Sequence, residues 1–329
     1  MSEAIIIVGS NRRPMQQVTS QRWTLETAVG GDGLAMIEIL GQSVLQRTVA
    51  ELKKAKVDGI SICVDEPVSS EIDEGSVDAV CPVTTAWESA AERLHELASN
   101  GTQSVLIVEL GSYVELDFAD FLRLHTEAGR AVTRAFHEVG PLNLWVVNPA
   151  AFPDINEIET VLDDSSGAVF QTSGYVNRLV TPADLRQLAS DGLGGRCQFR
   201  PRGSEVKPGI WMAPGAIVEK AARIVAPAYI GRGVSIGDEC LITRGSNVES
   251  DSEVDYGTTI EASSILSNTY VGIGLDLSHS VAQGNRLLNL QHQVLLHVSD
   301  PAVIRQNRKL APGDSHLPFD LGIGEAVTT

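Results

Sequence analysis

Large aliphatic residues recur at every sixth position through much of the C-terminal half of the chain. Nine such positions follow one another without a break: Met212, Val218, Ile224, Ile230, Ile236, Ile242, Val248, Val254 and Ile260. The residue two places before each of them is small or β-branched, except at Ile210. A period of six fits neither an α-helix nor a strand that alternates between two faces.

This repeat predicts a parallel β-helix, in which short strands turn a corner every six residues. The aliphatic residues would fill the narrow interior, and the small residues would lie near the corners. Glycine is expected to supply turn conformations at positions 215, 231, 233, 237, 245 and 257. After Ile260 the repeat continues at Ile265 and Val271, one residue out of phase, and it fades near Gly284. The A-x-[ILV]-G pattern resembles the left-handed β-helix of hexapeptide-repeat proteins.

The N-terminal half alternates amphipathic and apolar segments. Leu45, Val49 and Leu52 recur at helical spacing after a turn at Gly41, which predicts a helix. Further helices are expected in "AWESAAERLHELASNG", closed by Asn-Gly, and in "DFADFLRLHTEAG". The apolar runs "GISICV" and "SVLIVEL" predict buried strands. Strands that alternate with helices predict a largely parallel α/β sheet, which binds ligands at the carboxyl ends of its strands.

Three regions follow from these patterns. We expect an α/β domain over residues 1–200, the β-helix over residues 201–290 and a C-terminal tail over residues 291–329. The segment 289–306, "NLQHQVLLHVSDPAVIRQ", fits a strand or a helix equally well.

Composition narrows the function classes. The chain of 329 residues has 25 Lys and Arg against 42 Asp and Glu, a net charge of −17 that disfavours nucleic-acid binding. The four cysteines, Cys63, Cys81, Cys197 and Cys240, form no closely spaced pair, as expected for a reduced chain without a zinc site. The sequence contains no signal-peptide pattern and no apolar run of the ~20 residues that a membrane span needs. We therefore expect a cytoplasmic protein without membrane contact.

Four segments, in order along the chain, resemble those of sugar nucleotidyltransferases. They are residues 37–64, residues 105–133 with "ELGSYVELD", residues 140–152 with "GPLNLWVVNPAAF" and residues 174–185, "GYVNRLVTPADL". With the β-helix behind them, the layout resembles a mannose-1-phosphate guanylyltransferase or a glucose-1-phosphate nucleotidyltransferase. The resemblance implies a Rossmann-like mixed sheet and the joining of a sugar 1-phosphate to a nucleoside triphosphate. In that family a Gly-rich loop and a lysine hold phosphates, and two aspartates hold Mg²⁺.

The positions that match the family's phosphate-binding groups have mostly changed. The family's loop aligns with "VGSNRRP", in which only Gly9, an arginine (Arg12 or Arg13) and Pro14 remain. The lysine position falls near Leu34, which cannot pair with a phosphate. Gly9, Arg12, Arg13, Gly111 and Arg178 are thus the candidates for nucleotide contact.

Both metal positions have changed as well. The first aspartate falls on Ser112, directly after Gly111, and the second falls on Arg178. A fixed positive charge ~4 Å from Mg²⁺ is repulsive by more than about 1 kcal/mol even in water, and arginine does not lose its proton. Arg178 either pairs with a phosphate in place of the metal or is an exposed arginine without a role. We expect no metal ligand here, and Mg²⁺ only if the protein is active.

Other features of this half bear on the same question. Glu109, Glu115 and Asp117 flank Gly111 and could hold a metal, but Glu109 is placed on a buried strand face and Asp117 at a helix N-terminus. The interval 134–139 is too short for the strands that cover the sugar in the family, so an open pocket is expected.

Three functions remain open. The first is a catalytically impaired nucleotidyltransferase-like protein, a regulatory or scaffold subunit that still binds a nucleotide or sugar phosphate. The second is an active NDP-sugar pyrophosphorylase with displaced ligands. The third is a hexapeptide-repeat acyltransferase, whose candidate bases are His279, His292 and His297, all outside the clean repeats. Flat β-helix faces also suggest a homo-oligomer, or a hetero-oligomer with an active paralogue.

Overall fold

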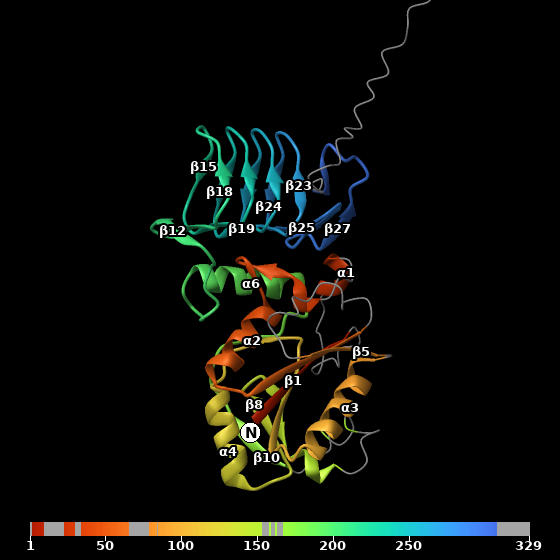
Figure 1. Cartoon of the computed structure of the whole chain (residues 1–329). Helices are drawn as coiled ribbons and strands as arrows, with labels where there is room; N and C mark the ends of the chain where they lie inside the picture. The colour runs from red at the N-terminus through yellow and green to blue at the C-terminus, as the bar shows by residue number, and fades with distance from the viewer. Residues whose placement is uncertain are drawn as a thin grey trace, which may run out of the picture.

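The computed structural model describes residues 2–9, 23–29, 34–65, 79–83, 85–152, 158, 162 and 167–307. It has an α/β part and, stacked on it, a β-helix, with helix α6 between the two (Figure 1). The strands of the central sheet are β1 (Ser2–Val8), β4 (Gly59–Asp65), β5 (Ala79–Val83), β6 (Ser104–Glu109), β8 (Val132–His137), β9 (Gly140–Val147) and β10 (Ala168–Gln171). The helices are α1 (Leu25–Val29), α2 (Val44–Lys54), α3 (Ala86–Ser99), α4 (Phe118–Ala128) and α6 (Pro182–Leu193), with the short 3-10 helices η1 (Leu34–Met36) and η4 (Pro149–Ala151).

The central sheet is mixed, with strand order β10-β8-β9-β6-β1-β4-β5. Strand β1 pairs in parallel with β4 and β6, and β4 pairs in parallel with β5. Strand β9 runs antiparallel to both β6 and β8. Strands β8 and β9 form a hairpin that includes the interval 134–139, which sequence analysis described as short. The predicted Rossmann-like mixed sheet is therefore confirmed.

The helices begin where their capping residues stand. Ser43 and Gln46 form a capping box at the start of α2. At the start of α4, Asp117 accepts a hydrogen bond from the backbone N–H of Asp120, and this cap was predicted. Thr181 and Asp184 form a second capping box at the start of α6. Buried faces of these helices cover the sheet.

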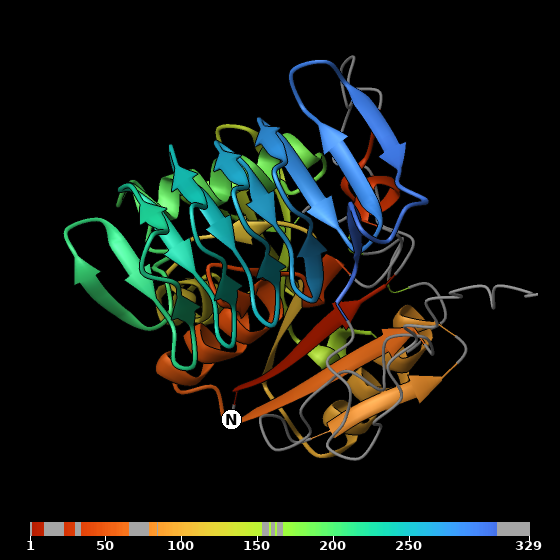
Figure 2. The ribbon, with the colours of Figure 1, turned by 90° about the horizontal axis from the view of Figure 1, so that it is seen from above.

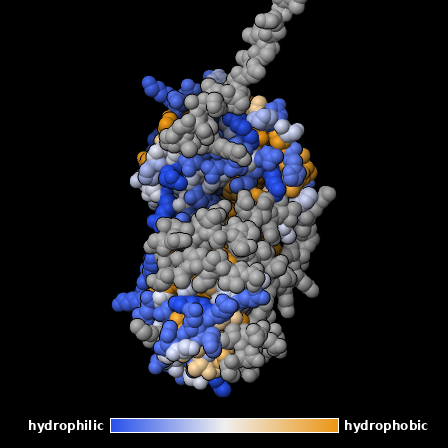
Figure 3. All heavy atoms as spheres, turned by 45° about the vertical axis from the view of Figure 1, so that its right-hand side comes forward, coloured by the Kyte–Doolittle hydropathy of each residue, from blue (hydrophilic) through white to orange (hydrophobic). Residues whose placement is uncertain are grey.

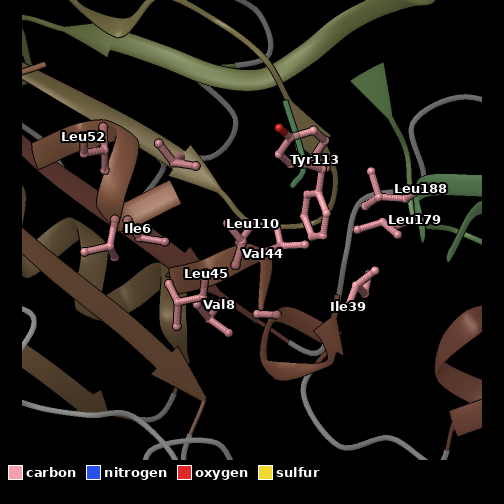
Figure 4. Close-up of a cluster of buried hydrophobic side chains, with 14 of the residues drawn as sticks. Ile6, Val8, Ile39, Val44, Leu45, Leu52, Leu110, Tyr113, Leu179 and Leu188 are labelled. Carbon is pink, nitrogen blue, oxygen red and sulfur yellow. The ribbon is translucent and has the colours of Figure 1, made fainter. Parts of the chain in front are cut away.

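Apolar side chains pack on both faces of the central sheet. One cluster joins the Ala4–Ile6–Val8 face of β1 to α2, α4 and α6 (Figure 4). The other cluster joins Ile5 and Ile7 to α3. Because β1 contributes to both clusters from alternate residues, it lies at the centre of the α/β core.

Three parallel sheets make up the β-helix. They contain β13 (Ile210–Met212), β14 (Ile217–Val218), β15 (Arg223–Ile224), β16 (Ala228–Ile230), β17 (Ser235–Ile236), β18 (Leu241–Thr243), β19 (Ser246–Val248), β20 (Glu253–Val254), β21 (Thr259–Glu261), β22 (Ser264–Ile265), β23 (Thr269–Val271), β24 (Asp276–Ser278) and β25 (Ser280–Gln283). Figure 2 shows their strands side by side when seen from above.

The coil length changes where the sequence repeat slips. Ile210 pairs with Ala228, and Arg223 pairs with Leu241, in each case 18 residues later. Beyond the slip Val248 pairs with Ile265, 17 residues later. The predicted phase shift after Ile260 is therefore one residue lost from a corner between β21 and β22.

The repeated aliphatic positions line the interior, as predicted. The residues from Ile230 to Ile260 in the series are fully buried, and Ile265 and Val271 continue the core beyond the slip. Met212, Val218 and Ile224, in the first coil, are partly exposed at the open end.

The glycines serve two different purposes, which corrects the sequence expectation. Gly215, Gly233, Gly245 and Gly257 adopt positive φ angles at turns. Gly231 and Gly237 do not; a Cβ on Gly231 would lie 2.8 Å from the backbone carbon of Glu249 in the next coil. These two positions need glycine because adjacent coils approach closely there.

The chain after the coils forms strands. Segment 289–306 contains the short antiparallel strands β27 (Val294–His297) and β28 (Ile304–Gln306). Strand β26 (Arg286–Asn289) lies between β25 and β27 in its sheet. At the other end of the same sheet, β12 (Ser204–Lys207) pairs antiparallel with β13. The domain boundaries at 200 and 290 stay a prediction, and the apolar cluster around α2 and α6 also includes Tyr229, Leu266 and Val281 of the β-helix.

Where described residues are visible in Figure 3, polar colours prevail, with apolar residues among the polar ones of the β-helix. Exposed apolar side chains of the β-helix include Ile273, Val294 and Leu296.

No helix within the described residues is long and apolar enough to cross a membrane. Cys63, Cys197 and Cys240 are buried and form no disulfide, and Cys81 has no described side chain.

Candidate functional site

Two of the predicted glycines follow the carboxyl ends of the adjacent strands β1 and β6. Ile7 pairs with Glu109, and the backbone N–H of Leu110 donates to the carbonyl of Ile7 at 2.8 Å. Gly9 comes two residues after Ile7, and Gly111 comes two residues after Glu109. Both glycines are half-buried at the edge of the sheet where α/β proteins bind ligands.

Ser112 and Arg178 flank a second pair of strands. Strands β7 (Tyr113–Val114) and β11 (Val176–Asn177) are antiparallel, and Asn177 pairs with Tyr113. Ser112 directly precedes Tyr113, and Arg178 directly follows Asn177. The two positions that sequence analysis matched to aspartates thus lie at the same end of this strand pair.

Arg178 contacts the turn of the β8–β9 hairpin. Its Nη2 donates a hydrogen bond to the carbonyl oxygen of Val139. Among the described residues it forms no ion pair. Sequence analysis missed Val139 because nothing in the short interval before Gly140 indicated a contact with residue 178.

The carboxylates near Gly111 are held by other parts of the protein. Glu109 is buried, and its Oε2 accepts a hydrogen bond from Asn143 Nδ2 at 2.7 Å. Glu115 accepts hydrogen bonds from the hydroxyl of Tyr113 and the backbone N–H of Gln198. Asp117 caps α4. Each carboxylate thus faces a different protein donor.

Mg²⁺, which the family resemblance implies, does not fit this edge. Ser112 and Arg178 offer a neutral hydroxyl and a positive guanidinium, whereas Mg²⁺ prefers carboxylate oxygens. Within the described ranges no group of three or more His, Cys, Asp or Glu side chains could hold a metal ion. No step is therefore assigned to a metal here.

The other predicted residues lie elsewhere or outside the description. Leu34 opens the 3-10 helix η1, and its side chain is outside the described part of the chain. Arg12 and Arg13 lie outside the described residues. His279, His292 and His297 are exposed at the C-terminal end of the β-helix, far along the chain from the edge residues.

Comparisons with known proteins give similarities to solved structures but not to known sequences. No family model matches the chain, and no curated protein sequence matches it. A solved structure from Bacillus anthracis, described as a glucose-1-phosphate thymidylyltransferase in complex with sucrose, is similar with a TM-score of 0.43 and 11% sequence identity. The similarity covers 57% of this chain and 93% of that one. The α/β sheet and β-helix described above rest on this chain's own strand pairing.

Proposed function

We propose that the chain is a sugar nucleotidyltransferase-like protein that is catalytically impaired and binds a nucleotide or a sugar phosphate without Mg²⁺. The observation that supports this is the position of Ser112 and Arg178, each directly beyond the paired residues Tyr113 and Asn177, while Gly9 and Gly111 follow the adjacent strands β1 and β6. The protein would act as a regulatory or scaffold subunit, assembled with copies of itself or with an active paralogue.

The charge of Arg178 suits a phosphate. A guanidinium has five N–H donors in a planar fork, and the hydrogen bond to Val139 uses one nitrogen. The remaining donors can reach a phosphate oxygen that Mg²⁺ would otherwise hold. Backbone N–H groups near two glycines can approach the same anion closely.

Loss of the metal has a chemical consequence. Transfer of a nucleotidyl group needs charge neutralisation on the departing pyrophosphate as well as on the attacked phosphate. One guanidinium can position an anion, but it does not replace two carboxylate-held metal contacts. We therefore propose binding without efficient turnover.

A thermal-shift experiment tests this proposal. Nucleoside triphosphates and NDP-sugars are added to the full chain in EDTA or in Mg²⁺, and the melting midpoint is followed. Ligand that binds the folded state at 100 times its Kd stabilises it by about 2.7 kcal/mol, so the midpoint should rise equally in both buffers. Arg178→Ala should abolish the rise.

The control variant removes one arginine charge at a position away from Arg178. Arg130 is an exposed arginine after α4, and Arg130→Ala should keep the rise. A rise that requires Mg²⁺ and is accompanied by pyrophosphate release would contradict the proposal in favour of an active pyrophosphorylase. Acyl-CoA turnover abolished by His279→Ala would contradict it in favour of an acyltransferase.

A further inference from the structure

A cavity whose lining excludes Ser112 and Arg178 lies between the α/β part and the connection to the β-helix. It has a volume of about 830 Å³ and is bounded by α2, by the connection from β7 to α4 and by residues 198–202. Residues 198–202 lead from α6 to β12, so the cavity borders the chain that joins the α/β part to the β-helix. Neither Ser112 nor Arg178 lines it.

Four basic residues line this cavity: Arg47, Lys54, Arg200 and Arg202. Arg47 lies with its guanidinium carbon 3.6 Å from the ring centre of Phe199, and its Nη2 donates to the carbonyl of Arg200 at 2.7 Å. Its Nε is buried without a hydrogen-bond partner. The backbone of the connecting segment and an aromatic ring thus hold this cation in place.

The hydrogen bonds that the structure records for Arg47 and Arg202 go to neutral oxygen atoms. Arg202 donates from Nε to the amide oxygen of Gln42 at 3.0 Å, a neutral acceptor. Over the described part of the chain, Arg47, Arg200 and Arg202 form no ion pair. Three positive charges therefore line one cavity of a protein whose net charge is −17.

The acidic residues that line the cavity are already engaged. Glu51 pairs with Lys54 at 2.6 Å, and Asp117 caps α4. Glu115 accepts a hydrogen bond from the hydroxyl of Tyr113 at 3.0 Å. The carboxylates thus do not neutralise the arginines.

Arg47 stays charged at neutral pH. Burial is the main cause that lowers the pKa of Arg47, to about 10, and the charge of Arg202 contributes to this lowering. Arg47 and Arg202 line the same cavity, so their positive charges repel each other there. A bound dianion would relieve the repulsion by pairing with both.

We propose that this cavity is a binding site for a phosphorylated small molecule, with its phosphate held by Arg47 and Arg202. The cavity volume is in the range of small-molecule sites. Tyr113, Val114 and Pro201 offer an apolar wall for the rest of the ligand. Arg202 also donates its backbone N–H to the carbonyl of Leu40 at 3.0 Å. A ligand bound to Arg202 would therefore also stabilise the contact between the α/β part and the segment that leads to the β-helix.

Calorimetric titration of the full chain tests the proposal, with inorganic phosphate and glucose 6-phosphate as probes at constant ionic strength. We expect saturable binding of both probes, tighter for glucose 6-phosphate. Arg202→Gln and Arg47→Gln should each weaken binding by about 10-fold or more, because each removes a charged donor to the phosphate. Arg123→Gln, an exposed arginine on α4 outside the cavity, should leave the Kd unchanged.

The outcomes separate this site from the sheet edge. Arg202→Gln should remove glucose 6-phosphate binding that Arg178→Ala retains, and Arg202→Gln should leave nucleotide binding unchanged. The proposal is overturned if wild type shows no saturable phosphate binding, if Arg202→Gln binds as wild type does, or if Arg178→Ala is the variant that loses it. Arg202 is exposed, so Arg202→Gln decides the question even if Arg47→Gln does not fold.

Discussion

Glu249 is a fully buried carboxylate at the junction of the two parts of the protein. It accepts hydrogen bonds from the backbone N–H groups of Leu40 and Gly41 at 2.7 and 2.9 Å, and from Asn247 Nδ2 at 2.6 Å. Burial raises the pKa of Glu249 to about 7, the three N–H donors partly oppose this, and nearby Glu38 adds to it. At this residue the protein holds a proton more tightly when folded than when unfolded.

The sign of the pH dependence follows from that shift. A raised carboxyl pKa stabilises the folded state in full below the ordinary value of 4.5, and the contribution is lost as the pH rises through 7. Between these limits we expect Glu249 to lower the free energy of unfolding by on the order of 3 kcal/mol. Urea denaturation of wild type and Glu249→Gln at pH 5 and pH 8 measures the effect as a difference between the two proteins.

The control for this prediction is a carboxylate elsewhere in the β-helix. Glu253 is partly exposed on β20, and Glu253→Gln should follow the pH dependence of wild type. If the stability of Glu249→Gln has the same pH dependence as that of wild type, the burial of Glu249 has no energetic consequence and the prediction fails.

Sequence did not reveal Glu249. Its partners Leu40 and Gly41 lie 209 and 208 residues away, and no local pattern connects them. The sequence did contain one signal, an acidic residue directly after the interior position Val248. This signal could be interpreted only with the position of the turn between β2 (Glu38–Ile39) and β3 (Gln42–Ser43).

At the scale of elements, hydroxyl groups at the corners of the β-helix connect successive coils. Ser252 donates to the carbonyl of Leu266 and accepts from the N–H of Thr269. Thr258 donates to Gly272 at 2.6 Å and accepts from Leu275 at 3.0 Å. These hydroxyls explain the change from alanine to serine and threonine along the small-residue positions, since each one satisfies two buried backbone groups.

Thr258→Val tests this role. Valine keeps the shape of threonine but leaves the carbonyl of Gly272 and the N–H of Leu275 without their partner. We expect a loss of about 2 kcal/mol in the free energy of unfolding, measured by urea denaturation. Thr259→Val, at the partly exposed neighbouring position, should change it by less than about 0.5 kcal/mol. Equal effects of the two substitutions would show that the hydroxyl connection is unimportant.

Most elements could be predicted because their signals are local. The six-residue spacing predicted which residues fill the interior of the β-helix. Local signals also predicted the helices: apolar residues at helical spacing for α2, a closing Asn-Gly for α3 and the capping residue Asp117 for α4. Two-residue strands such as β7 and β11 carry no periodic signal, so the neighbourhood of Ser112 and Arg178 was available only from the family resemblance. Positive φ at Glu239, Arg244 and His279 was also unpredicted, because such turns are usually glycine.

At the scale of the whole molecule, a buried arginine fixes α6 to the β-helix. Arg186 donates to Asn247 Oδ1 at 2.9 Å, to Ser264 Oγ at 3.1 Å and to the carbonyl of Gly245 at 3.0 Å. Asn247 in turn donates to Glu249, so α6 and the β2–β3 turn hold the same part of the β-helix. Together with the shared apolar cluster, this network predicts that the α/β part and the β-helix unfold together.

Unfolding followed by two probes tests this prediction. Tryptophan fluorescence, which includes the buried Trp145 of the α/β part, and circular dichroism should give coincident urea transitions in wild type. Arg186→Met removes the donor to Asn247, Ser264 and the carbonyl of Gly245, and should lower the free energy of unfolding by about 3 kcal/mol. Arg130→Met, at an exposed arginine after α4, should have little effect. Separate transitions in wild type would show that the junction does not couple the two parts.

The cationic cavity belongs to the same scale and could not be predicted from sequence. Arg47 lies on α2, whereas Arg200 and Arg202 lie 153 or more residues later, and the fold brings them to one cavity. A basic segment "RPR" in an acidic chain was the local signal, but by itself it fits a solvated loop as well.

Crystals grown with a nucleoside triphosphate and Mn²⁺ test the central claim most directly, because anomalous scattering locates the metal. The account predicts phosphate density against Arg178, next to Gly9 and Gly111, and no anomalous peak between Ser112 and Arg178. A Mn²⁺ peak at that position, bridging the protein and the phosphates, would contradict it.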